Sequence, residues 1–161
     1  MTNTERPSAI KAPVLALDLG EKRVGVAISD NLSIAITRIS HIRRSNWKDL
    51  LNEVKALVRS FDAQTLVIGF PLSLDGTEGT AAIEARRVAD NFARSLDIPV
   101  YLQDERLTSA AAEAHLREEG FSAKEIRALV DSESAAIILR DFLQGGQERV
   151  LIPTPTNNNA E

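Results

Sequence analysis

Three acidic residues of this chain lie at the ends of predicted strands or at the start of a predicted helix, and these elements are expected to bring them close together. Asp18 ends the apolar run at 14–17, Glu105 follows the apolar run at 99–102, and Asp131 opens a stretch with helical spacing. An ionised carboxylate beside an apolar core is tolerated only when it is paired or binds a cation. Three carboxylates around one point repel one another, so their grouping predicts a bound divalent cation.

Oxygen ligands of this kind select Mg²⁺ or Mn²⁺ rather than zinc. In such a site, metal ions activate water and stabilise the leaving oxygen of an in-line phosphodiester displacement. Simpler roles stay open at this point: a turn cap for Asp18, a helix cap for Asp131 and a surface ion pair for Glu105. Asp104, which adjoins Glu105, is an alternative ligand.

Buried strands must bring these residues together, and apolar runs predict them at residues 14–19, 65–70 and 99–102. Two amphipathic helices are expected between them, one capped by Ser45 with Trp47 on its core side, and one along 85–96. Because right-handed crossovers make the three strands parallel, their carboxyl ends share one sheet edge, where α/β sheets bind ligands. Asp18 and Glu105 therefore converge on this edge.

Further elements complete a three-layer α/β domain. They are antiparallel strands at 24–29 and 34–42, an alanine-rich helix to residue 119, a helical turn or two capped by Ser122, a last helix at 131–144 and a short strand at 150–152. The expected domain covers 14–152, with a flexible lead-in at 1–12 and a disordered tail at 153–161.

Composition limits the possible classes of protein. With no cysteine and only two histidines among 161 residues, disulfides, thiolate metal sites and a histidine-rich zinc site are disfavoured. No apolar run approaches the roughly 20 residues of a membrane span, and the composition suits a cytoplasmic protein. The net charge of −4 gives no overall basic field. The densest basic stretch either extends an RNA-binding surface or guards a strand edge, and it holds Arg38, Arg43, Arg44 and Lys48.

Four stretches, at 18–30, 69–77, 104–109 and 130–136, resemble in order the signatures of the YqgF (RuvX) family. The resemblance covers about residues 14–152. It implies a ribonuclease H-like fold with a five-stranded mixed sheet flanked by helices, in a bacterial cytoplasmic protein. It also implies a nuclease that trims the 5′ end of precursor 16S ribosomal RNA. An older assignment in the family is Holliday-junction resolvase.

Carried over position by position, the resemblance places the acidic site, with its Mg²⁺ or Mn²⁺, on Asp18, Glu105 and Asp131. It also implies that Lys22, Arg23 and Arg106 are candidates for contacting substrate phosphates. It also assigns substrate contact to a loop that holds Asp75, Gly76 and Thr77. Each of these substrate-binding candidates is equally well explained as part of a charged turn or an Asp-Gly turn.

The expected function is therefore a metal-dependent nuclease that hydrolyses phosphodiester bonds in precursor 16S ribosomal RNA. The alternative substrate is branched DNA, as a four-way Holliday junction. Two alternatives belong to other classes of protein. One is a nucleotide-binding module, because a strand ending in Asp-x-Gly also begins a phosphate-binding hairpin. The other is an assembly factor that binds RNA without cutting it. The oligomeric state, monomer or homodimer, stays open.

Overall fold

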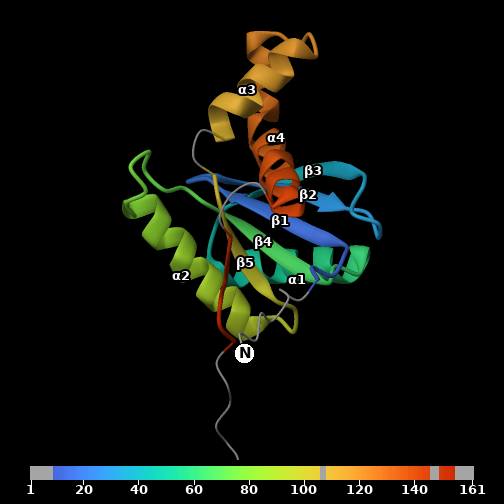
Figure 1. The fold of residues 1–161 in the computed structure, drawn as a ribbon, viewed down its shortest axis with the longest axis vertical. Coiled ribbons are helices and arrows are strands. Elements are labelled where there is room, and N and C mark those ends of the chain that lie inside the picture. The colour runs from blue at the N-terminus through green and yellow to red at the C-terminus, as the bar shows by residue number, and fades with distance from the viewer. Residues whose placement is uncertain (1–8, 106–107, 146–148, 155–161) are drawn as a thin grey trace, which may run out of the picture.

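The computed structural model describes residues 9–105, 108–145 and 149–154. In this part of the chain the elements are, in order, β1 (Val14–Leu19), β2 (Arg23–Ser29), β3 (Ile36–Arg43), α1 (Trp47–Phe61), β4 (Thr65–Phe70), α2 (Thr80–Ser95), β5 (Val100–Asp104), α3 (Thr108–Glu118), α4 (Ala123–Gln144) and β6 (Arg149–Leu151). Figure 1 shows α3 and the first half of α4 projecting beyond the sheet. Most of the expected lead-in and tail lies outside the described residues.

One mixed sheet has the strand order β3-β2-β1-β4-β5-β6. As predicted, β1, β4 and β5 are parallel, whereas β2 and β3 continue the sheet antiparallel. The sheet has six strands rather than the expected five, because β6 pairs antiparallel with β5. This short strand covers backbone groups that an open edge of β5 would leave unpaired.

The two faces of the sheet carry separate apolar cores. Leu15 and Leu17 of β1 pack with side chains of α1 and α2, whereas Val14 and Ala16 pack with α4. This alternation is what a strand buried on both faces produces, since successive side chains point to opposite sides. The three-layer arrangement predicted for the sequence is therefore confirmed, with α4 as the cover of one face.

The start of helix α1 is fixed by a capping side chain and by the packing of its first residue, Trp47. Trp47 lies edge-on to Phe92 of α2, with ring centroids 4.7 Å apart, which confirms its predicted place against the core. The cap is Asn46, whose side chain accepts a hydrogen bond from the Asp49 amide at 2.9 Å. The predicted cap, Ser45, is wrong by one residue, and its hydroxyl instead donates to the Asp49 carboxylate.

Helix α4 is continuous over 22 residues, where the sequence predicted a short capped turn and a separate helix from Asp131. The predicted Ser122 capping box is present, but Asp131 lies inside the helix and does not begin it. No proline or glycine interrupts residues 123–144, so nothing in the sequence stops the first turn from continuing. Neither α4 nor any other described helix is long and apolar enough to cross a membrane.

Replacing Asn46→Ala should destabilise the fold by about 1 kcal/mol, because the Asp49 amide loses its acceptor at the start of α1. Equilibrium urea unfolding measures this change. The matched variant is Ser45→Ala, which should stay within about 0.5 kcal/mol of the wild type. A larger loss for Ser45→Ala than for Asn46→Ala would contradict this assignment of the cap.

Candidate active site

The carboxyl ends of β1, β4 and β5 meet at one edge of the sheet. Asp18 is the fifth residue of β1 and faces the α4 side, like Val14 and Ala16 before it. Glu105 directly follows β5, and its amide donates to the Phe70 carbonyl of β4 at 3.1 Å. This backbone bond holds Glu105 against the end of the neighbouring strand.

The carboxyl groups of Glu105 and Asp18 form a hydrogen-bonded pair. Burial, which is the largest cause, the charge of Asp18, a hydrogen bond from Glu105 to Asp18 and the charge of Asp104 together raise the pKa of Glu105 to about 9. Without a cation, Glu105 therefore keeps its proton at neutral pH and donates it to the Asp18 carboxylate. Two carboxyl groups this close are both ionised only when a positive charge lies between or beside them.

Glycines make the room that this pair occupies. A Cβ atom on Gly69 of β4 would lie 2.5 Å from Oε2 of Glu105 and 2.7 Å from Cδ1 of Ile138 on α4. The Glu105 carboxyl therefore lies over β4 where a side chain would otherwise stand. Across the other neighbouring strand, Asp18 lies opposite Gly25 of β2. The strand ends form a cradle for carboxylates because these two positions lack side chains.

Asp104 belongs to the opposite face of the sheet. Val100 and Leu102 of β5 pack in the core under α1 and α2, so alternation places Asp104 on that face as well. Asp104 is 3% exposed, and its charge acts on Glu105 from behind the strand. Of the two neighbouring acids, it is Glu105 that shares a face and a hydrogen bond with Asp18.

The third predicted acid lies on α4. Asp131 precedes Ile138 by seven residues in a continuous helix, a spacing that returns to the same helix face. Ile138 is the α4 residue beside the Gly69 cradle. The side chain of Asp131 and the whole of Arg106 lie outside the described residues. Within the described part of the chain, no three acidic or histidine side chains group closely enough to hold a metal ion.

Lys22 lies in the tight turn between β1 and β2, and Arg23 is the first residue of β2. The Gly20 amide donates to the Arg23 carbonyl at 2.9 Å, and a Cβ on Gly20 would lie 2.5 Å from that carbonyl oxygen. Both cationic residues are exposed. The turn follows Asp18 directly, so these side chains extend from the same sheet edge as the carboxyl pair.

The loop after β4 is closed by its own hydrogen bonds. The amide and hydroxyl of Thr77 donate to the Asp75 carboxylate at 3.0 and 2.7 Å. These bonds hold the pKa of Asp75 below its usual range. Gly76 has a φ of 86°, which favours glycine. Asp75 therefore acts within the loop as a turn former, and the exposed loop stands at the same edge as the carboxyl pair.

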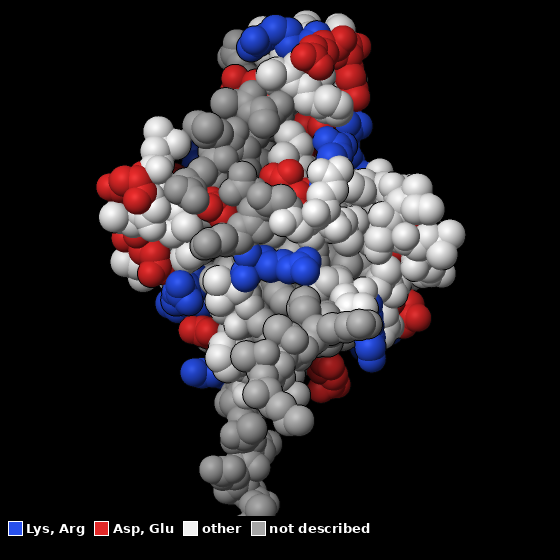
Figure 2. All heavy atoms as spheres, in the orientation of Figure 1, with Lys and Arg blue, Asp and Glu red and all other residues white. Residues whose placement is uncertain are grey.

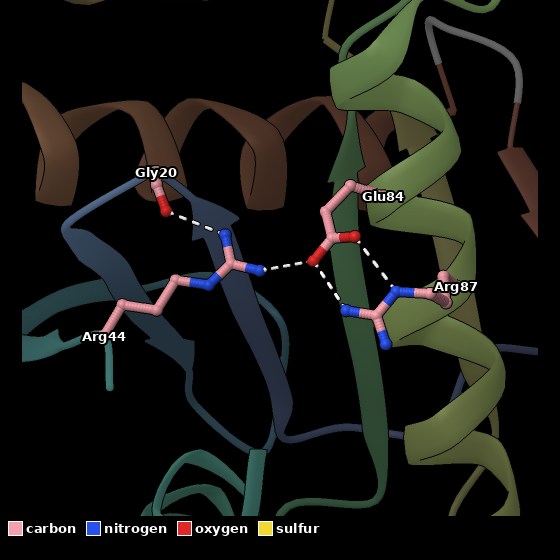
Figure 3. Close-up of polar contacts among 4 residues, drawn as sticks. All are labelled: Gly20, Arg44, Glu84 and Arg87. Atoms are coloured by element: carbon pink, nitrogen blue, oxygen red, sulfur yellow. Dashed lines mark hydrogen bonds and ion pairs between the residues drawn. The ribbon is translucent and has the colours of Figure 1, made fainter. Parts of the chain in front are cut away.

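Arg44 ties the β1–β2 turn to helix α2, as Figure 3 shows. Its guanidinium donates to the Gly20 carbonyl at 2.9 Å and to Glu84 at 2.8 Å. Glu84 also accepts two hydrogen bonds from Arg87, and this bidentate contact is the main reason why the pKa of Glu84 is lowered. A cavity of about 390 Å³ adjoins this network between the ends of β1 and β4 and the first turns of α2.

Arg38 is held by a buried acid that the sequence did not single out. Glu133 of α4 is fully buried, and its carboxylate contacts Arg38 of β3 and Nδ1 of His115 on α3. Glu119 lies 3.4 Å from the other ring nitrogen of His115. Two of the four residues in the predicted basic stretch are thus ion-pair partners of the protein's own carboxylates: Arg38 of the buried Glu133, and Arg44 of the partly exposed Glu84. The signal in the sequence was an acid just before the apolar helical run at 135–139.

Charges of both signs are interspersed on the face of the molecule shown in Figure 2. This agrees with the net charge of −4 and indicates no face-wide basic field. Attraction for a polyanion on this face would therefore depend on local groups or on a bound cation.

Comparison with known proteins identifies the family. A family model described as RuvX, Holliday junction resolvase, matches residues 12–145. This chain belongs to the RuvX family. A relative from Anaeromyxobacter sp. (strain Fw109-5) is 43% identical over 81% of this chain and 96% of its own length, and one from Syntrophus aciditrophicus (strain SB) is 38% identical over 85% and 92%. Both carry the name "Putative pre-16S rRNA nuclease".

Solved structures add evidence about the fold. T. thermophilus RuvC in complex with a Holliday junction substrate superposes with a TM-score of 0.54, over 85% of this chain and 98% of that chain, at 13% identity. At this identity the likeness concerns the fold alone, and it is the ribonuclease H-like fold that the sequence predicted. The RuvX matches confirm the expected family and its class, nucleases that hydrolyse phosphodiester bonds.

In metal-free buffer, stability should fall as the pH rises from 4.5 toward about 9, because unfolded chains ionise Glu105 in this range while the folded state keeps its proton. Glu105→Gln removes the titrating group, so this loss should become smaller. Urea unfolding at a series of pH values measures the slope. Glu53→Gln, on the exposed side of α1, should keep the wild-type slope. An identical slope for Glu105→Gln would show that Glu105 is not buried with its proton.

Proposed function

We propose that this protein is a divalent-metal-dependent nuclease whose substrate is precursor 16S ribosomal RNA. The observation that carries the proposal is the hydrogen-bonded pair of half-buried carboxyl groups, Glu105 and Asp18, with Glu105 over Gly69 at the shared edge of three parallel strands. The proposal places the protein in the cytoplasm, where such RNA is processed, and assigns catalysis to a domain spanning residues 14–152.

The carboxyl pair suits a hard divalent cation. Both groups offer oxygen ligands, and each opposes ionisation of the other unless a positive charge intervenes. Mg²⁺ or Mn²⁺ would be held by Asp18 and Glu105, with Asp131 of α4 as the third ligand. Support for Asp131 comes from its position, seven residues before Ile138, which lies beside the Gly69 cradle.

The bound cation would supply activation of water and stabilisation of the charge on the leaving oxygen. The residues of the chain would position the metal ligands and the substrate. Gly69 leaves space for the Glu105 carboxyl, and the Phe70 carbonyl holds the Glu105 backbone. Lys22 and Arg23, on the turn after Asp18, would contact substrate phosphates, together with Arg106.

The loop formed by Asp75, Gly76 and Thr77 would contact the substrate through its exposed surface rather than through the Asp75 carboxylate. That carboxylate already accepts two hydrogen bonds from Thr77. A loop held in shape by its own bonds meets a substrate with little loss of conformational entropy. It stands beside the carboxyl pair because it follows β4 directly.

RNA is favoured as substrate by the names of the relatives that are 38–43% identical over most of the chain. The family description favours a second candidate, four-way DNA. Cleavage of a precursor ribosomal RNA and of a synthetic four-way junction, assayed side by side with Mg²⁺ and with Mn²⁺, separates the two. Binding of RNA by the wild-type protein without cleavage would instead support an assembly factor.

Asp18→Asn should abolish cleavage while leaving the fold intact, because it replaces one carboxylate of the pair by a neutral amide of the same shape. Cleavage of labelled precursor RNA measures activity, and circular dichroism reports the fold. The matched control is Asp97→Asn, an exposed aspartate beyond the opposite end of the sheet, which should cleave like the wild type. Wild-type cleavage by Asp18→Asn would contradict the assignment of the site.

Gly69→Ala should lower cleavage by about 100-fold, because the new Cβ displaces the Glu105 carboxyl and a small misplacement of a catalytic group has effects of this size. Gly79→Ala is the matched variant, since its Cβ would lie 4.0 Å from the nearest side-chain atom, Oγ of Ser73. It should retain activity within a few fold. Equal activities for both variants would show that the space over Gly69 does not matter.

A further inference from the structure

Gln103 of β5 is buried beside the carboxyl pair. It pairs in register with Gly69 of β4, and residues in register on parallel strands share a face. Tyr101, two residues earlier, packs against Phe142 of α4, with ring centroids 5.1 Å apart. Gln103 therefore lies on the α4 face of the sheet, the face that also carries Asp18 and Glu105.

The Gln103 amide is polar, fully buried and without a partner among the described residues. Its exposure is 0%, and neither Oε1 nor Nε2 makes a hydrogen bond there. A buried amide without partners costs free energy that an apolar side chain of the same size would avoid. The presence of a buried amide here is explained if the amide gains a hydrogen-bond partner when the neighbouring site holds its cation.

The geometry points to the Glu105 carboxyl as that partner. Residues two apart on one strand point to the same face, about 7 Å apart, a span that the long side chains of Gln103 and Glu105 bridge. Oε2 of Glu105 lies where the Cβ of Gly69 would be, that is, over the residue that neighbours Gln103 across the sheet. The space between the amide and the carboxyl is therefore free of any Gly69 side chain.

The residue on the other side of Gln103 is already engaged. Arg149 of β6 pairs in register with Gln103, but its guanidinium donates to the Phe142 carbonyl at 3.0 Å and lies over the Phe142 ring. Arg149 is thus held toward the end of α4. On the β4 side of Gln103, the Glu105 carboxyl lies over Gly69, the residue that pairs in register with Gln103.

We infer that Gln103 is a positioning residue, whose amide donates to the Glu105 carboxylate when that carboxylate holds a divalent cation. The inference rests on the proposed metal site. Without the cation, Glu105 is hydrogen bonded to Asp18. A carboxylate that holds a cation keeps acceptor sites that the cation does not use; the Gln103 N–H group satisfies one of them, and this bond orients the ligand and strengthens cation binding.

The test compares Gln103→Met, which keeps the length of the side chain and removes both polar atoms, with the wild type. Calorimetric titration with Mn²⁺ should give a dissociation constant raised about tenfold, the usual cost of removing a group that orients a metal ligand. The thermal unfolding midpoint without metal should be unchanged or higher, because an unpartnered buried amide has been removed. If Gln103 had a merely structural role, Gln103→Met would lower the unfolding midpoint and would not specifically weaken Mn²⁺ binding.

Two further variants complete the experiment. Tyr101→Phe, on the same strand and face, should match the wild type in Mn²⁺ affinity, whereas Asp18→Asn should lose Mn²⁺ binding altogether. If wild type and Gln103→Met bind Mn²⁺ equally, the inference is overturned and the proposed function stands. If Gln103→Met is less stable without metal and binds Mn²⁺ normally, the amide is structural and the inference also fails. If the wild type binds no Mn²⁺, the proposed metal site fails and the inference with it.

Discussion

The hydrogen bond between Glu105 and Asp18 is the interaction on which the rest of the site depends. Two carboxyl groups lie together in a largely buried position, which is stable without a cation only because Glu105 keeps its proton. The fold makes this possible through parallel strands that end together and through Gly69, which leaves the space for one carboxyl group. The same two carboxyl groups would supply oxygen ligands to a divalent cation, which would compete with the proton of Glu105 for the site.

Ion pairs among neighbouring elements hold the frame around that pair. Arg44 links the turn after β1 to Glu84 of α2, and buried Glu133 links α4 to β3 and α3 through Arg38 and His115. Both networks join segments that are distant in sequence, and the Arg44 network borders the sheet edge that carries the carboxyl pair. Arg38 and Arg44 form ion pairs with carboxylates of other elements, so the basic stretch around β3 contributes to the architecture as well as to the surface charge.

The strands and their shared edge could be predicted because buried parallel strands leave continuous apolar runs, and Asp18 and Glu105 stand at the ends of two such runs. Features that depend on contacts between distant residues could not be predicted. Asn46 rather than Ser45 caps α1, and β6 adds a sixth strand by pairing with β5. Asp131 looked like a helix start because aspartate is a common cap, yet the capped turn before it simply continues.

The most direct test of the central claim is the number of protons released when Mn²⁺ binds near neutral pH. Calorimetry in buffers with different ionisation enthalpies measures this number. If Glu105 holds its proton until a cation displaces it, the wild type should release about one proton for each site filled, and Glu105→Gln should release none. Mn²⁺ binding by the wild type without proton release would show that Glu105 is already ionised and would contradict the account of the carboxyl pair.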